Sequence, residues 1–277
     1  MESVTTMVEA GLHRIEATVF GSGAAPVVVI EPALGGTARA WWPIAQTLAE
    51  DTTVVTYDRA PYGASSPARD GRTPRDVAAD LHVVLGSLGV AGPLVLVGHS
   101  LGGIYLRTYA ADHLDQVAGM VLVDSSHEGQ LPVLRERHTA KDRLLVALTV
   151  PQLILRSRQW RGGADRRSAV REYRMFKRLG AADQALSRGA LGSRPLIVVT
   201  RGPGSLAHLD GLWLAWCELQ KDLAQLSENS RHIISRSPNH YLNEGDPELL
   251  VGAIAEVVTS VRTGAPLGES VSASDGD

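Results

Sequence analysis

The stretch "LVLVGHSLGG", residues 94–103, joins four apolar residues to a serine that has glycines on both sides. A continuous run of Leu and Val is typical of a strand buried on both faces, as in a parallel sheet covered by helices. Gly98 and Gly102 stand two residues before and two after Ser100, where a strained backbone leaves no room for side chains. An apolar periodicity typical of a helix follows in "GGIYLRTYAADH" (102–113). The stretch therefore predicts a sharp strand-to-helix turn that carries Ser100.

The same alternation of strand and helix extends in both directions from this turn. Apolar strand candidates lie at 27–30, 53–57, 94–97, 119–123 and 196–200. Between them lie helical patterns such as residues 73–88, with Thr73 as N-cap and Pro74 at the first helical position. Two earlier segments, 4–10 and 12–20, are expected to pair antiparallel. We therefore expect an α/β fold with a mostly parallel central sheet flanked by helices.

The alternation stops between residues 126 and 193. Residues 126–194 hold 15 Lys and Arg against 6 Asp and Glu, whereas the rest of the chain is acidic. We expect 126–192 to form a helical cap inserted into a core made of 1–125 and 193–262. Its charge fits either a solvated surface or the recruitment of an anionic substrate or an acidic partner. The polar segment 263–277 is expected to be disordered.

Composition argues against several classes of protein. The net charge of the 277 residues is −3, whereas nucleic-acid-binding proteins are normally basic. The longest mostly apolar stretch, 144–155, is too short to span a bilayer, and the N-terminal residues lack the pattern of a signal peptide. Cys217 is the only cysteine, so no intrachain disulfide can form. We expect a cytoplasmic protein with no nucleic-acid or membrane partner.

No cofactor or metal is expected either. The sequence contains no metal-ligand spacing and no phosphate-binding Gly-Lys-Ser/Thr loop. The pair Gly35-Gly36 is too weak a signal for a dinucleotide site.

A serine hydroxyl is a weak nucleophile, so it needs a base and an acid that orients the base. The last strand candidate is "RHIIS", residues 231–235. Among nine histidines, His240 alone lies in a loop just after it, where the chain returns to the carboxyl edge of the sheet. Asp124 ends a strand at that same edge, and Asp210 precedes an apolar helix that it could cap. We favour Asp124 as the acid, and Asp210 stays an alternative. An idle Ser100 and a solvent-exposed His240 are the structural alternatives to this chemistry.

Three further residues, Glu31, Trp41 and Trp42, allow both a functional and a structural interpretation. Glu31 is a carboxylate at the end of a strand near Ser100. Trp41 and Trp42 could line a substrate pocket, yet two tryptophans that open a helix are more often packing residues.

The segments "LVLVGHSLGG", "VVTYDRAPYGASS", "VAGMVLVDSSHE" and "NHYLNEGDPELLVGAI" resemble the α/β-hydrolase fold family, in its cofactor-free, esterase-like serine hydrolase branch. The resemblance implies that Ser100 is the nucleophile and His240 the base. The acid of this family can follow either of two strands, and "VLVDSSHE" resembles the branch that uses Asp124. The resemblance also implies an oxyanion hole made by the backbone N–H groups of Leu101 and Leu34.

The sequence departs from the family pattern at three places. Pro32-Ala33 replaces the usual His-Gly pair, and Pro61 and Pro238-Asn239 occur where small residues are commoner. The donor by position is Leu34, two residues beyond Pro32, so the missing N–H of Pro32 does not exclude the hole. These changes bear on the shape of the pocket more than on the chemistry.

The resemblance implies a serine hydrolase that acts on a small-molecule ester, lactone or thioester through an acyl-serine intermediate. An acyl-CoA or a carrier-protein thioester would account for a cationic cap. A biosynthetic acyl transferase, cyclase or lyase on the same fold is an alternative reaction. A non-catalytic ligand-binding relative is an alternative class.

Overall fold

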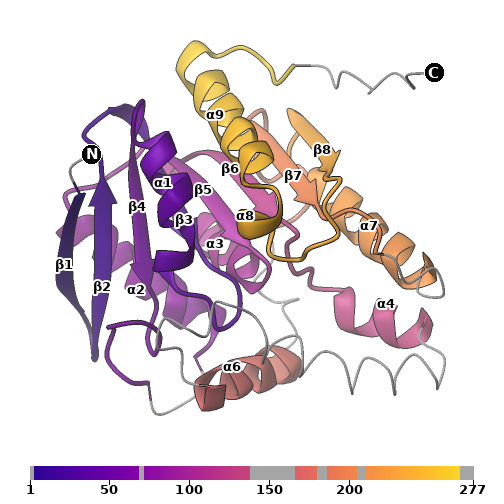
Figure 1. The fold of residues 1–277 in the computed structure, drawn as a ribbon, viewed down its shortest axis with the longest axis horizontal. Coiled ribbons are helices and arrows are strands. Elements are labelled where there is room, and N and C mark those ends of the chain that lie inside the picture. The colour runs from indigo at the N-terminus through magenta and orange to yellow at the C-terminus, as the bar shows by residue number, and fades with distance from the viewer. Residues whose placement is uncertain (1–2, 69–71, 138–165, 180–185, 205–209, 269–277) are drawn as a thin grey trace.

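The computed structural model describes residues 3–68, 72–137, 166–179, 186–204 and 210–268. Eight strands form one sheet in the order β1-β2-β4-β3-β5-β6-β7-β8, and all pairs from β4 to β8 are parallel (Figure 1). β1 pairs with β2, and β2 with β4, in antiparallel fashion. The strands are β1 Ser3–Ala10, β2 His13–Phe20, β3 Ala24–Glu31, β4 Thr52–Asp58, β5 Leu94–His99, β6 Val117–Val123, β7 Leu196–Thr200 and β8 Ser230–Ile234. The predicted α/β class and mostly parallel sheet are confirmed.

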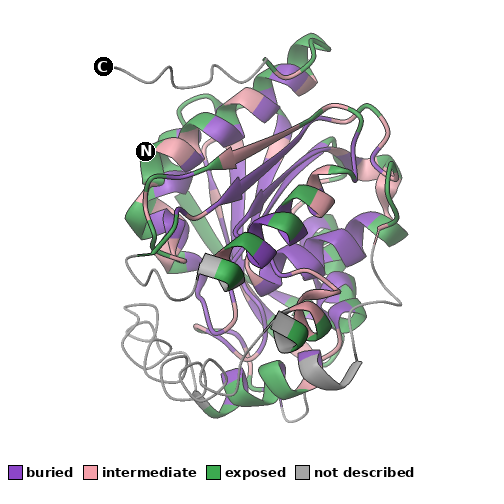
Figure 2. Ribbon diagram, turned by 90° about the vertical axis from the view of Figure 1, so that its right-hand side faces the viewer, coloured by how far each residue is buried: buried purple, intermediate pink, exposed green. Residues whose placement is uncertain are grey.

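Both faces of the sheet are buried, which explains the unbroken apolar runs in the sequence. In β5, Leu94 and Leu96 join one core cluster, and Val95 and Val97 join the other. Figure 2 shows buried residues concentrated in the strands and in the helix faces that pack on them. The alternation of side chains along each strand therefore fills two cores at once.

Helices cover the two faces. α1 (Trp42–Leu48) and α9 (Pro247–Thr263) pack on one face, and α2 (Pro74–Ser87), α3 (Leu101–Asp112) and α7 (Asp210–Ala224) pack on the other. Short helical segments are η1 (Ala38–Trp41), η2 (Leu114–Gln116) and α8 (Leu242–Gly245). α2 begins as the sequence predicts, since Thr73 and Asp76 form a capping box with Pro74 in the first turn.

The described part of the predicted cap contains two helices, α4 (Gln130–Arg137) and α6 (Arg166–Leu179). In Figure 1, α6 lies below the sheet and α4 lies at the lower right, below α7. Residues 138–165 and 180–185 of the cap lie outside the described residues. Along α6, Ser168, Ala169, Glu172 and Phe176 are buried at helical spacing. The predicted cap boundary at 192 falls late, because Leu191 is already fully buried in the core.

The predicted tail begins too early at residue 263. α9 continues through Thr263, and Gly264 takes the left-handed conformation that ends it. The chain then turns back so that Leu267 packs against the core and its N–H donates to Asn229 Oδ1 at 3.0 Å. Residues 269–277 lie outside the described residues.

No helix within the described residues combines the length and the apolar character needed to cross a bilayer.

Candidate active site

Ser100 lies at a sharp turn between β5 and α3, with φ +53° and ψ −120°. The neighbouring glycines are required by close packing. A Cβ at Gly98 would lie 2.6 Å from Gly103 Cα, and one at Gly102 would lie 2.4 Å from the carbonyl oxygen of Glu31. Ser100 N–H donates to Val123 O at 3.0 Å, and Ser126 N–H donates to Ser100 O at 2.9 Å. These contacts with the end of β6 hold a backbone conformation that is costly for a residue with a side chain.

Asp124 follows β6 and is fully buried. Its Oδ2 lies 2.6 Å from His240 Nδ1 and 2.7 Å from Arg201 Nη1, and its Oδ1 accepts from Trp216 Nε1 at 2.6 Å. Burial alone would raise the pKa of Asp124, but the Arg201 cation and the bonds from His240 and Trp216 hold this pKa well below its usual value. The carboxylate is therefore ionised and holds one nitrogen of His240.

Arg201 was not among the residues that the sequence singled out. It is the first residue after β7, the neighbour of β6 in the sheet, and its backbone N–H also lies 3.3 Å from Asp124 Oδ1. Its position at a strand end on the carboxyl edge was a signal that could have identified it. Asp210, the alternative acid, is the first residue of α7, and its side chain lies outside the described part of the structure.

The His240 loop is held by its own polar side chains and by the serine turn. Tyr241 N–H donates to Asn239 Oδ1 at 3.0 Å, so the unusual Asn239 shapes the turn around His240. His99, the residue before Ser100, has Nε2 2.9 Å from the carbonyl oxygen of His240. A carbonyl can only accept, so His99 carries its proton on Nε2, and burial lowers the pKa of His99 to about 3. A neutral His99 therefore links the Ser100 turn to the His240 loop.

The two candidate oxyanion donors come from neighbouring loops at the carboxyl edge. Leu101 is the first residue of α3, where helix N–H groups have no partner inside the helix. Leu34 lies in a turn closed by Gly36 N–H to Ala33 O at 2.9 Å, with Gly35 at φ +68°. β3 pairs with β5 so that Glu31 is opposite Gly98, which brings both loops together. The side chains of Leu34 and Leu101 also share one apolar cluster with Phe176 of α6.

Comparison with known proteins gives the family. The family model for the alpha/beta hydrolase fold matches residues 26–199. The chain belongs to this family. Among solved structures, an esterase from Thermogutta terrifontis has a TM-score of 0.69 at 21% identity, covering 95% of this chain and all of that one. The enol-lactonase from Burkholderia xenovorans LB400 has a TM-score of 0.69 at 16% identity, covering 92% of this chain and all of that one.

Curated relatives match over different lengths. YqjL of Bacillus subtilis, an uncharacterized protein, is 23% identical over 88% of both chains. A segment covering 46% of this chain is 31% identical to the "Probable transporter efuK" of Hormonema carpetanum, and the match spans only 19% of that protein. The match to YqjL thus covers most of both proteins, whereas the match to efuK covers less than half of this chain.

In this alpha/beta hydrolase, Glu31 is wholly engaged by its neighbours. The carboxylate is fully buried, accepts from Arg59 Nη1 at 2.7 Å, and contacts the Tyr57 hydroxyl. Burial raises the pKa of Glu31 to about 7 against the opposing effect of Arg59.

The two tryptophans are packing residues: Trp41 is fully buried, and Trp42 meets Phe20 edge to face.

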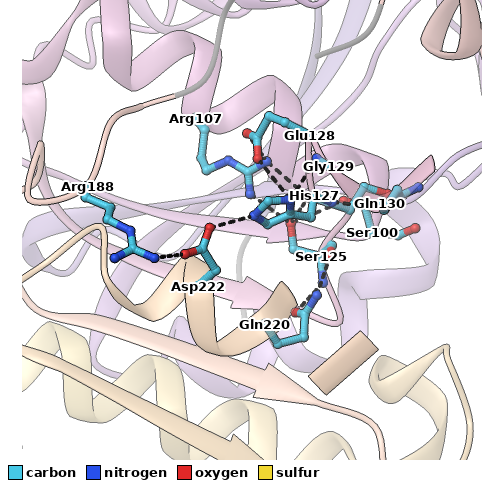
Figure 3. A network of polar contacts seen from close by, with 11 residues as sticks. Ser100, Arg107, Ser125, His127, Glu128, Gly129, Gln130, Arg188, Gln220 and Asp222 are labelled. Atoms are coloured by element: carbon cyan, nitrogen blue, oxygen red, sulfur yellow. Dashed lines mark hydrogen bonds and ion pairs between the residues drawn. The ribbon is translucent and has the colours of Figure 1, made fainter. Parts of the chain in front are cut away.

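A second His–Asp pair lies near Ser100 (Figure 3). His127 Nδ1 accepts from Gly129 N–H at 2.8 Å, so its Nε2 carries the proton and faces Asp222 Oδ2 at 3.0 Å. Both ring nitrogens of His127 are therefore engaged, and this histidine supports the segment after Asp124. In the part of the chain that the structure describes, no group of three His, Cys, Asp or Glu side chains could hold a metal ion.

Proposed function

We propose that the protein is a serine hydrolase that cleaves a small-molecule ester, lactone or thioester through an acyl-Ser100 intermediate. The observation that carries the proposal is the 2.6 Å contact between Asp124 Oδ2 and His240 Nδ1 at the sheet edge that also bears the strained Ser100. A buried carboxylate on Nδ1 leaves the other ring nitrogen, Nε2, as the one that accepts a proton.

The reaction follows from these roles. His240 Nε2 takes the Ser100 proton while Oγ forms a bond to the substrate carbonyl carbon. The oxyanion so formed is stabilised by the N–H groups of Leu34 and Leu101. Collapse of the tetrahedral intermediate breaks the bond to the leaving group, which receives the proton from His240. Water then repeats these steps on the acyl-enzyme and releases the acid, and Asp124 stabilises the imidazolium in both halves.

The substrate class rests on chemistry and on likeness of fold. An esterase and an enol-lactonase share the architecture, which supports acyl chemistry without naming the acyl group. An acyl-CoA or carrier-protein thioester remains within this proposal, because such donors are anionic and α6 exposes Arg167, Arg171 and Arg174.

The test uses wild type, Ser100→Ala, His240→Ala and the double variant against a panel of esters, lactones and thioesters of different chain length. Each single variant should lose about 10⁴-fold in kcat or more, and the double variant should lose little beyond that, since nucleophile and base act as a unit. Circular dichroism checks that the fold is kept. A folded Ser100→Ala variant with more than a tenth of wild-type activity would remove Ser100 from the mechanism.

A further inference from the structure

Arg59 is a buried charged residue that contacts the segment Pro32–Leu34 directly after β3. This segment carries the candidate donor Leu34 and is called the oxyanion loop below. It directly follows β4, and only 1% of its side chain is exposed. Its guanidinium donates to the backbone carbonyls of two consecutive loop residues, from Nη1 to Pro32 O at 3.0 Å and from Nη2 to Ala33 O at 2.7 Å. The next residue in the chain is Leu34.

The Ala33 carbonyl and the Leu34 N–H belong to one planar peptide group. The Ala33–Leu34 peptide is trans, so its C=O and N–H point in opposite directions. A guanidinium that holds the carbonyl oxygen therefore also fixes the direction of the N–H on the far side. Gly36 N–H binds the same oxygen at 2.9 Å, which leaves that peptide little freedom to rotate.

We propose that Arg59 is a positioning residue for the oxyanion hole, which orients the Leu34 N–H by holding the Ala33 carbonyl. This inference rests on the proposed function, because it assigns the second donor of the hole to Leu34. Hydrogen bonds from a cation are stronger than neutral ones, and a polarised carbonyl makes the N–H of the same peptide a better donor. Arg59 thus acts on both the direction and the strength of that donor.

Two glutamates keep the guanidinium in place. Glu31 Oε1 accepts from Nη1 at 2.7 Å, and Glu172 of α6 accepts from Nε at 2.8 Å and from Nη2 at 3.2 Å. Glu172 also accepts from the hydroxyls of Tyr62 and Tyr105, each at 2.6 Å. It is the one acidic residue in the sequence of α6, and it faces inward. Glu172 and Arg59 thereby link the helix of the cap to the oxyanion loop, in addition to the apolar contacts of Phe176 there.

Stability alone is a poor explanation for this arrangement. Buried ion pairs give little net stability over apolar residues of the same size, because desolvation offsets the attraction. Orientation of a peptide group requires a fork of donors with fixed geometry, which arginine supplies and lysine does not.

The experiment compares wild type with Arg59→Met and Arg59→Lys, and uses Arg194→Met as a matched control. Arg194 donates to the backbone carbonyl of Val117 at 2.7 Å, at the opposite end of β6 from Asp124. The readout is the rate at which an alkyl fluorophosphonate labels Ser100, which needs no knowledge of the substrate. The same rate is measured with the P=S analogue, since sulfur accepts hydrogen bonds poorly and gains less from the hole.

Arg59→Met should slow labelling by the P=O reagent about 10–100-fold, which is less than the loss of a whole donor. The ratio of P=O to P=S rates should fall in parallel, by about tenfold. Arg59→Lys should lie between Arg59→Met and wild type, and Arg194→Met should stay within twofold of wild type in both measurements. Thermal melts identify variants that do not fold, and if Arg59→Met is one of them, Arg59→Lys decides.

Two results overturn the inference. One is a folded Arg59→Lys whose labelling rate and P=O to P=S ratio are within twofold of wild type. The other is a folded Arg59 variant that is labelled more slowly while its P=O to P=S ratio is unchanged. Failure of the proposed function looks different. In that case the wild type is not labelled at all, or Ser100→Ala is labelled as fast as wild type.

Discussion

At the scale of single residues, Asp124 is surrounded by donors. His240, Arg201 and Trp216 all bind its carboxylate, which lies out of contact with solvent. Such a set favours the ionised form and fixes the imidazole of His240 in one tautomer.

Asp124→Asn should therefore reduce kcat/KM by about 10⁴-fold, because an amide at this position favours the wrong tautomer of His240. Asp210→Asn is the matched comparison, and we expect its kcat/KM to stay within a few fold of wild type. Steady-state kinetics on the two folded variants gives the ranking. The reverse ranking would transfer the role of the acid to Asp210.

At the scale of elements, β5 and α3 approach each other through glycines at the Ser100 turn. Gly98→Ala would place a Cβ 2.6 Å from Gly103 Cα, so backbone must move. We expect this overpacking to lower the free energy of unfolding by about 1–3 kcal/mol. Gly86→Ala in α2 is the control: a Cβ there meets nothing within 4 Å, and alanine should stabilise by roughly 0.5–1 kcal/mol. Urea denaturation measures the free energy of unfolding of both variants. A Gly98→Ala variant as stable as Gly86→Ala would contradict the close approach of Gly98 to Gly103.

The outward face of α6 is cationic, since Arg167, Arg171 and Arg174 are exposed while Glu172 is buried. If this face recruits an anionic thioester, kcat/KM for that donor should fall as salt rises toward 0.15 M, where the screening length is about 8 Å. A neutral ester should show a flat profile, because steering acts only on charged ligands. Equal salt profiles for the two substrates would assign these arginines to a solvated surface.

At the scale of the whole molecule, buried carboxyls make stability depend on pH. Burial raises the pKa of Glu31 from 4.5 to about 7, so the folded protein holds a proton there that the unfolded chain releases. That contribution to stability is fully present below pH 4.5 and is lost as the pH rises through 7. Asp124 acts in the opposite sense: its lowered pKa contributes stability above pH 3.8 that is lost in acid.

Glu31→Gln should therefore flatten the decline in the free energy of unfolding between pH 5 and pH 8, by about 1–3 kcal/mol. The exposed Glu228→Gln is the control and should retain the wild-type decline. Denaturant unfolding at the two pH values measures the difference. A slope in Glu31→Gln as steep as in wild type would assign the decline to other groups, of which Asp58, with a pKa raised by burial to about 6, is the first to test.

Local sequence patterns determined the strands, the helix of residues 73–88 and the turn at Ser100. These features depend on neighbours in the chain: unbroken apolar runs, a capping box, and glycines two residues from a serine. His240 could be singled out for the same reason, since its place after the last strand can be read from the order of the elements.

The contacts among the candidate site residues were decided only by the tertiary structure. Asp124 and His240 are 116 residues apart, and Arg201 joins them because β6 and β7 are neighbours in the sheet. Arg59 reaches Ala33 and Glu172 across 26 and 113 residues. The sequence also placed Glu31 near Ser100 without indicating that Arg59 and Tyr57 occupy its carboxylate. Periodicity reports which side chains face a core, but not which polar groups meet at the edge of the sheet, because that depends on strand order and loop closure.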